Sequence, residues 1–501
     1  MILSAVLFGQ AYSLRLDPKL RSAAQPYAPL GTLYAAAALR ARGHEVALFD
    51  AMLAESAAEW RQSLERHRPR FAVLYEDSFN YLSKMCLGRV RAAGLEMIGD
   101  TRRAGATVVV AGSDATDHPD LYLRAGAAAV VVGEGEATLP ALLEALEAGT
   151  PPAQVAGLAL LGGAGVERTA ARPPLRDLDA LPPPAWDLVD VERYRRLWRA
   201  RHGYFSMNVA ASRGCPYHCN WCAKPIYGQR YGIRSAGAVV DELAALKEAY
   251  APDHVNFVDD IFGLRPQWVE EFADAVAARG LRLPFKCLCR ADLLGPRTVD
   301  ALRRAGCRTV WLGAESGSQK VLDAMEKGTR VEQVRAAAER LRAAGIETGF
   351  FVQFGYPGET WEDVEKTRAL LRECRPDDIG ISVAYPLPGT PFYARVEAQL
   401  GAKRNWDDSD DLDMMYRGPF AAGFYRRLHK AVHAEFRLRR LRERGGLSAR
   451  QWAARLYHRL ALPVHEAALR RLARHPNQGV GELPVALAPE RAAVPSEQPG
   501  A

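Results

Sequence analysis

Residues 212–222 read Ser-Arg-Gly-Cys-Pro-Tyr-His-Cys-Asn-Trp-Cys and hold three of the chain's eight cysteines. An apolar run at 206–210, directly before them, predicts a buried strand. Three thiolates on one tight loop can bind three irons of an iron–sulfur cube and leave the fourth iron without a ligand from this loop. Zinc is one alternative, although structural zinc sites usually offer two separated cysteine pairs, and a trio of buried thiols is the other. The triplet predicts an iron–sulfur centre with one iron open to substrate.

The cysteine segment opens a repeating pattern of strands and helices over residues 201–395. Apolar runs at 206–210, 254–258, 284–288, 309–312, 348–354 and 378–383 alternate with amphipathic stretches at 236–250, 267–279, 297–305, 331–344 and 361–373. Six such repeats predict a partial (β/α)6 barrel related to the TIM barrel. Active sites of barrels lie at the carboxyl ends of the strands, where the cysteine loop is expected.

Residues 1–150 predict a separate α/β domain. Apolar runs at 2–8, 46–49, 71–74, 107–111 and 127–132 alternate with helical stretches at 32–42, 87–104 and 137–148. Strands buried on both faces and joined by helices indicate a doubly wound parallel sheet. Ligands of such sheets bind at the carboxyl ends of the strands, where two loops follow: Gly112-Ser113-Asp114 and Gly133-Glu134-Gly135-Glu136.

The remaining segments differ from these two in composition. Proline pairs predict that residues 151–200 are a linker without long regular elements, residues 396–475 are predicted to be helical and basic, and residues 476–501 to be a disordered tail. No stretch is predicted to span a membrane, and the N-terminal apolar run has no basic leader, so we expect a cytoplasmic protein.

Charge is concentrated near the C-terminus. The net charge is +7, and residues 425–474 alone hold 14 Lys and Arg against 3 Asp and Glu. One interpretation is a docking helix with a solvated arginine face, and the other is a helix that contacts an anionic membrane or an acidic substrate. A stable nucleic-acid partner is not expected, because no aromatic platform interleaves the basic residues.

The cysteine spacing C-x3-C-x2-C, the aromatic residue before the last cysteine and the six βα repeats resemble the radical S-adenosylmethionine (SAM) superfamily. The resemblance implies a 4Fe–4S cluster on Cys215, Cys219 and Cys222, whose free iron binds the amino and carboxylate groups of SAM. One electron, from a donor such as flavodoxin or ferredoxin, would cleave SAM to methionine and a 5′-deoxyadenosyl radical that abstracts hydrogen from an unreactive carbon.

Two later segments extend this resemblance. Gly-Ala-Glu-Ser-Gly-Ser at 313–318 resembles the family's G-x-E-S-G-S segment, and Gly-Tyr-Pro-Gly-Glu-Thr at 355–360 resembles its G-x-P-G-E-T turn. Taken alone, the first segment is also typical of a helix N-cap with an acidic first turn, and the second is as typical of a tight turn with an N-cap as of a direct SAM contact. The resemblance implies SAM contacts through Glu315, Ser316, Gly317, Gly358 and Glu359.

Four polar side chains near predicted strand ends are further candidates. Arg290 is a candidate for a bidentate contact to the SAM carboxylate, or for an ordinary ion pair. Asp259 and Asp260 are candidates for substrate binding or proton transfer, or simply solvate the barrel mouth. Tyr385, with Thr390 nearby, is a candidate for the lining of the substrate cavity.

The N-terminal region resembles the cobalamin-binding domain fused to many radical SAM enzymes. Pro-Leu-Gly at 29–31 before a helix, Gly-His-Glu-Val at 43–46 before a strand, and the two glycine loops carry this resemblance. The D-x-H-x-x-G motif is absent, so cobalamin would bind without a protein ligand to cobalt, or the domain serves only packing or substrate binding. The resemblance implies cobalamin contacts through Gly112, Ser113, Gly133, Glu134 and Gly135.

The family most similar to both regions is that of the anaerobic magnesium-protoporphyrin monomethyl ester cyclase and its cobalamin-dependent methyltransferase relatives. It implies methylation of an unactivated carbon in a small-molecule or lipid substrate. The alternatives are an oxidative cyclisation or rearrangement, and a cobalamin-binding protein without catalysis. A methylthiotransferase is disfavoured because Cys86 is the single cysteine before Cys215, and those enzymes carry a second set for another cluster.

Overall fold

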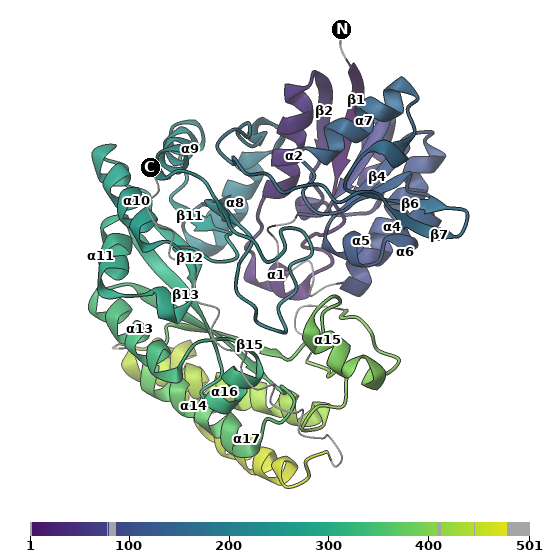
Figure 1. The fold of residues 1–501 in the computed structure, drawn as a ribbon. Coiled ribbons are helices and arrows are strands. Elements are labelled where there is room, and N and C mark those ends of the chain that lie inside the picture. The colour runs from purple at the N-terminus through teal and green to yellow at the C-terminus, as the bar shows by residue number, and fades with distance from the viewer. Residues whose placement is uncertain (1–2, 78, 80–86, 408–411, 445, 478–501) are drawn as a thin grey trace, which may run out of the picture.

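The computed structural model describes residues 3–77, 79, 87–407, 412–444 and 446–477, which form an N-terminal sheet, a barrel sheet and a C-terminal helical layer (Figure 1). The predicted disordered tail lies outside the described residues from 478 onward. No helix among the described residues combines the length and the apolar character that a membrane span requires.

The N-terminal sheet has the strand order β2-β1-β3-β4-β5-β6-β7, and its first five strands run parallel. Successive residues of a strand point to opposite faces, and Leu7 joins one apolar core while Val6 and Phe8 join another. Helices α3, α4 and α6 cover the first face and α2 and α7 the second, which confirms the predicted doubly wound fold.

The elements of this part are as follows. The strands are β1 (Leu3–Gly9), β2 (His44–Phe49), β3 (Phe71–Tyr75), β4 (Thr107–Ala111), β5 (Ala129–Val131), β6 (Leu158–Gly162) and β7 (Gly165–Arg168). The helices are α1 (Pro18–Ala23), α2 (Leu30–Ala41), α3 (Ala58–His67), α4 (Leu87–Arg103), α5 (Ser113–Asp117), α6 (Pro119–Ala125) and α7 (Thr138–Ala148).

The region between the two sheets is more regular than the sequence predicts. We expected residues 151–200 to lack long elements, but β6 and β7 add an antiparallel hairpin to the N-terminal sheet, and α8 (Val191–His202) has 12 residues. The proline pairs lie outside these strands and this helix, so their missing N–H groups interrupt no hydrogen-bonded ladder.

The second sheet is the predicted open barrel. Its six parallel strands follow the order β15-β14-β13-β12-β11-β8, and helices lie on its outer side (Figure 1). The strands are β8 (Ser206–Val209), β11 (His254–Phe257), β12 (Phe285–Cys289), β13 (Cys307–Glu315), β14 (Glu347–Phe354) and β15 (Asp378–Val383). The helices are α9 (Ala236–Tyr250), α10 (Pro266–Ala278), α11 (Pro296–Arg304), α12 (Gln319–Ala324), α13 (Val331–Ala343) and α14 (Trp361–Cys374).

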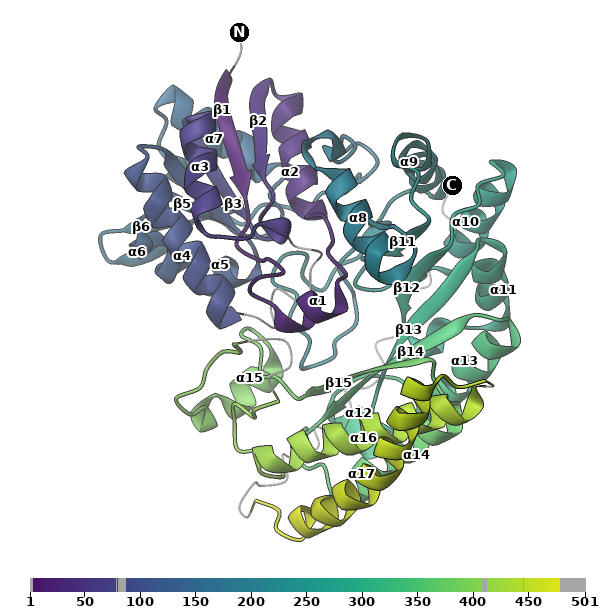
Figure 2. The same cartoon turned by 180° about the vertical axis from the view of Figure 1, so that it is seen from behind.

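The C-terminal part is helical, with α15 (Pro391–Val396), α16 (Ala422–Glu443) and α17 (Ala449–Ala473). Leu428, Val432 and Leu438 of α16 are buried, so α16 docks on the protein as one of the two interpretations of the basic segment requires. Helix α17 lies beside α16 at the outside of the molecule (Figure 2).

Candidate active site

The three cysteines lie on one loop whose ends are paired. Strand β9 (Ser212–Arg213) follows β8 and pairs antiparallel with β10 (Gly232–Ile233), so residues 214–231 form a closed loop. Cys219 is buried, while Cys215 and Cys222 are half-buried. Burial raises the pKa of the Cys215 thiol, so metal binding there has to displace a proton.

Two aspartates after β11 hold the start of this loop. The Asp259 carboxylate accepts hydrogen bonds from Ser212 Oγ (2.5 Å) and Ala211 N (3.2 Å), and Asp260 Oδ2 accepts one from Gly214 N (3.1 Å). Burial raises the pKa of Asp259 to about 7. Substrate binding and proton transfer, predicted for this pair, stay predictions, because these contacts position the backbone that leads into the first cysteine.

Asn220 fixes the middle of the loop. Its Nδ2 donates to Ala324 O (2.8 Å), its backbone N donates to Met325 O (3.1 Å), and its Oδ1 accepts from Tyr356 Oη (2.8 Å). The side chain is fully buried, so these bonds compensate for its desolvation. Sequence reasoning missed Asn220, although a polar residue between Cys219 and Trp221 was a visible signal.

Two cations lie beside the buried thiol. Arg290 Nη1 lies 3.9 Å from Cys219 Sγ, and its guanidinium stacks 3.5 Å above the Tyr217 ring. Its Nε and Nη2 bind Asp292 (3.0 and 3.1 Å), and the predicted fork toward the SAM carboxylate stays a prediction. Lys327, which sequence reasoning missed, is buried and pairs with Glu315 (2.9 Å).

In the 313–318 segment, Ser316 and Gly317 pack β13 against α14, whereas Glu315 has an unusual backbone conformation. Ser316 Oγ lies 3.0 Å from Thr367 Oγ1, Gly317 N donates to the same oxygen (2.9 Å), and a Cβ on Gly317 would overlap the Lys366 carbonyl oxygen. Ser316 and Gly317 therefore hold β13 against α14. Glu315 has φ +55°, a left-handed conformation that costs a non-glycine residue free energy and is common at functional sites.

The 355–360 segment is a turn that caps a helix. Thr360 and Asp363 form a capping box at the start of α14, and Lys320 donates to Gly358 O (2.7 Å). Glu359 Oε2 accepts from Gly355 N (2.6 Å), while Oε1 has no hydrogen-bond partner. Burial raises the pKa of Glu359 to about 8, so the carboxyl is protonated at neutral pH. The SAM contacts of Gly358 and Glu359 stay predictions.

Tyr385 and Thr390 serve packing and capping. The Tyr385 ring is buried edge-on against Trp406, with ring centroids 4.4 Å apart. Thr390 is the N-cap of α15. Their predicted place in a substrate cavity stays a prediction.

Neighbouring side chains come so close to Gly112 and Gly135 in the two N-terminal loops that a Cβ would not fit there. A Cβ on Gly112 (φ +139°) would lie 2.7 Å from Glu76 Cβ, and one on Gly135 would lie 2.5 Å from the Tyr75 ring. Ser113 opens α5, and Gly133 has φ +83°. Packing within the domain accounts for Gly112 and Gly135, so their cobalamin contacts stay predictions.

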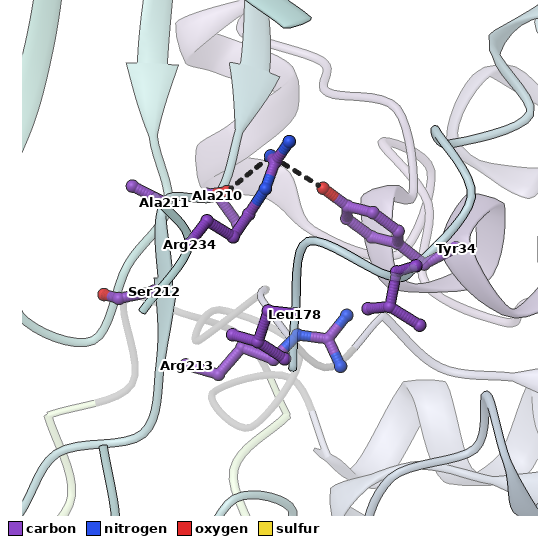
Figure 3. A pocket seen from close by; sticks show the side chains of 8 residues that line it. Tyr34, Leu178, Ala210, Ala211, Ser212, Arg213 and Arg234 are labelled. Atoms are coloured by element: carbon purple, nitrogen blue, oxygen red, sulfur yellow. Dashed lines mark hydrogen bonds between the residues drawn. The ribbon is translucent and has the colours of Figure 1, made fainter. Parts of the chain in front are cut away.

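Arg213 joins the cysteine loop to the N-terminal sheet. Its buried guanidinium pairs with Glu136 (2.7 Å) and Glu134 (3.2 Å) of the loop after β5, and it lies 5.2 Å from the Tyr34 ring centroid. Figure 3 shows Arg213 near Tyr34 and Arg234, whose guanidinium contacts Ala210 O (3.2 Å) and Tyr34 Oη (3.4 Å). Sequence reasoning assigned Glu134 to cobalamin and missed its pairing with a residue two positions before Cys215.

The side chains present fit two of the expected cofactors, the iron–sulfur cluster and cobalamin. Among the described residues, no three His, Cys, Asp or Glu side chains lie close enough together to bind one metal ion. A 4Fe–4S cluster does not require this, because each cysteine thiolate binds a different iron of the cluster. At the carboxyl edge of the N-terminal sheet, Gln10 Nε2 and Glu136 Oε2 are buried without a hydrogen-bond partner. These atoms suit a ligand with amide side chains, as a corrin has.

A cavity of about 170 Å³ lies between the N-terminal part and the barrel. Tyr27, Asp77 and Phe79 line it from the first, and Asn208, Asn256, Val258 and Lys286 line it from the second. The fold and this site define a radical SAM enzyme with a cobalamin-binding domain.

Family comparison supports this class. The family described as the radical SAM superfamily matches residues 209–371, and the B12 binding domain matches residues 19–143. The chain combines a radical SAM domain with a B12 binding domain, and the predicted 4Fe–4S cluster, SAM and cobalamin are confirmed as its cofactors.

Several curated proteins are similar to this chain. An uncharacterized methyltransferase of Pyrococcus horikoshii is 29% identical over 66% of this chain and 72% of its own length. The anaerobic magnesium-protoporphyrin IX monomethyl ester cyclase of Cereibacter sphaeroides is 30% identical over 54% and 45%, so the match spans about half of that enzyme. The hopanoid C-3 methylase of Methylococcus capsulatus is 28% identical over 74% and 69%.

Solved structures share the fold. OxsB, a cobalamin-dependent SAM radical enzyme with aqua-cobalamin and SAM bound, has a TM-score of 0.72 at 16% identity over 93% of this chain and 72% of that one. The radical SAM methyltransferase TsrM of Kitasatospora setae, with cobalamin and a 4Fe–4S cluster, has a TM-score of 0.66 at 23% identity over 79% and 75%.

Proposed function

We propose that this enzyme methylates an unactivated carbon of a small-molecule or lipid substrate. The observation that carries the proposal is the bonding of Arg213 to Glu134 and Glu136, which ties the loop of the three cysteines to the carboxyl edge of the cobalamin-binding sheet. When bound, the cluster and SAM supply a carbon-centred radical, and cobalamin supplies the methyl group. Relatives named as a methyltransferase and a hopanoid methylase support this choice over a cyclisation.

The protein's own part is to hold the two binding loops in a fixed relation. Asp259, Asp260 and Asn220 fix the backbone around the cysteines. Arg290 lies beside the buried Cys219 thiol and is itself stacked on the Tyr217 ring, which fixes the position of its guanidinium. Rigid support of this kind keeps reacting groups within the narrow geometry that a radical transfer requires.

The cavity between the two parts is our candidate for the substrate site. Lys286 places an amine there whose pKa is lowered by burial, while Asn208 and Asn256 add amide donors and acceptors. Phe79 and Val258 give the same cavity an apolar side. This lining suits a substrate with an apolar body and one polar or anionic group.

The proposal includes the surroundings of the enzyme. We propose a small iron–sulfur or flavin protein, such as ferredoxin or flavodoxin, as electron donor, and the cytoplasm as location. The described cysteines are free, which suits a reducing compartment. We propose no stable nucleic-acid partner.

The test is anaerobic reconstitution with iron and sulfide, followed by SAM carrying a labelled methyl group, cobalamin and a strong reductant. We expect 5′-deoxyadenosine from the wild type, none from Cys219→Ala, and wild-type amounts from the matched control Cys374→Ala on α14. Label on protein-bound cobalamin supports methyl transfer. 5′-Deoxyadenosine without label on cobalamin would favour a cyclisation or rearrangement, and no 5′-deoxyadenosine at all would overturn the proposal.

A further inference from the structure

Helix α17 presents its polar side to the protein. The Glu466 carboxylate binds the buried Arg368 guanidinium, with Oε2 3.2 Å from Nη1, and Arg427 Nη1 contacts His465 Nδ1 at 2.9 Å. Leu469 is its one fully buried side chain among the described residues. Contacts of this kind fix which side of the helix faces outward.

The outer side of α17 is apolar. Six of the ten large apolar side chains that the described residues expose lie on this one helix. Four of them recur every fourth residue and form what we call the outer stripe, with exposed fractions from 56% to 65%: Trp452, Leu456, Leu460 and Val464. A helix normally turns such a stripe toward the core, so an outward stripe marks an interaction surface.

The charges of α17 select the partner. The helix holds five arginines and one carboxylate, and that carboxylate, Glu466, is bound to Arg368. None of the five arginines forms an ion pair with a carboxylate that the structure describes: Arg450, Arg455, Arg459, Arg470 and Arg471. A second copy of this chain would bring the same arginines together, whereas an anionic surface would neutralise them.

We propose that the outer stripe of α17 binds the surface of an anionic lipid bilayer. The helix would lie in the plane of the interface, with Leu456 and Leu460 among the acyl chains and the arginines at the level of the phosphates. Trp452 and Tyr457 suit this depth, because their rings combine an apolar body with a polar edge. The inference is independent of the reaction that the enzyme catalyses.

The test uses the full chain with its cofactors, floated anaerobically with vesicles of phosphatidylcholine alone or mixed with phosphatidylglycerol. We expect binding to the mixed vesicles only, weakened by salt. The variant Leu456→Ser with Leu460→Ser should lower the vesicle-bound fraction about tenfold or more, because it removes two apolar anchors. Leu161→Ser with Leu197→Ser, two exposed leucines of other elements, should leave binding unchanged. Arg459→Gln with Arg470→Gln should lower binding to the mixed vesicles.

Four results would overturn the proposal. The wild type fails to bind mixed vesicles, or the double leucine variant binds as tightly as the wild type. The protein elutes as a dimer that the leucine variant splits, which assigns the stripe to a second copy. A chain shortened to end at Asn477 binds the mixed vesicles and the full chain does not, which would assign the outer stripe to residues 478–501 of the same chain.

Discussion

Single polar residues around the cysteines illustrate how far a sequence can be interpreted. Carboxylates after a strand end predicted substrate chemistry at Asp259 and Asp260, and the structure uses both to hold backbone N–H and hydroxyl groups. The types and positions of these residues were visible in the sequence, but their partners come from folding. Lys327 gave no sequence signal, because its role depends on Glu315, which lies 12 residues earlier and faces it only in the folded turn.

Glu359 gives a pH prediction at this scale. Its ordinary pKa of 4.5 rises to about 8 on burial, so the folded chain holds a proton that the unfolded chain releases. Because the pKa of Glu359 is higher in the folded chain, the protonated carboxyl contributes its full share of the unfolding free energy below about pH 4.5. This contribution is lost as the pH rises toward 8. We expect Glu359→Gln to match the wild type in unfolding midpoint at acidic pH and to exceed it at pH 8. A constant difference across the titration would contradict this assignment.

At the scale of elements, the periodicity of apolar residues along the sequence predicted the strands and helices of the barrel well. The spans of α9 and β15 agree with the structure, and the other barrel strands differ by a few residues. The misses have physical causes. β6 and β7 are short, and β7 is mostly polar, so their pairing with β5 depends on a sheet edge that the local sequence does not contain. Helix α17 has its apolar side outward, and the sequence left open whether this basic segment docks on the protein or contacts an anionic membrane or acidic substrate.

Gly317→Ala tests whether packing of β13 on α14 explains that glycine. The new Cβ would overlap the Lys366 carbonyl oxygen, so α14 must shift, and we expect a loss of about 1–3 kcal/mol in unfolding free energy. The matched control is Gly237→Ala in α9, where a Cβ meets nothing within 4 Å and should stabilise by about 0.5–1 kcal/mol. Urea unfolding measures both. Unchanged stability with reduced SAM cleavage would instead favour a direct SAM contact.

For the whole molecule, the relation between the two sheets was beyond sequence reasoning. Each sheet and each glycine loop could be predicted separately, because the local spacing of apolar residues and the turn-forming residues indicate them. The contact between the sheets requires Arg213, Glu134 and Glu136 to meet across about 80 residues of chain, and single-sequence patterns carry no information about such pairings. The N-terminal loop after β5 therefore acts as a support for the cysteine loop.

A double-mutant cycle on Arg213 and Glu136 tests this link. Both side chains are buried. Arg213→Gln leaves Glu134 and Glu136 without their cation and should cost about 3–5 kcal/mol in unfolding free energy, whereas Glu136→Gln leaves Arg213 paired with Glu134 and should cost less. The double variant leaves no unpaired charge at that pair, so we expect it to cost less than the sum of the two by about 1–3 kcal/mol. Urea unfolding measures the free energies, and retained cobalamin after gel filtration reports the geometry of the domain. Arg303→Gln is the control, because its pair with Asp300 is exposed and its loss should leave the urea midpoint unchanged. Additive single effects would mean that the two side chains stabilise their own parts independently, and that the cysteine loop does not depend on the N-terminal sheet for its position.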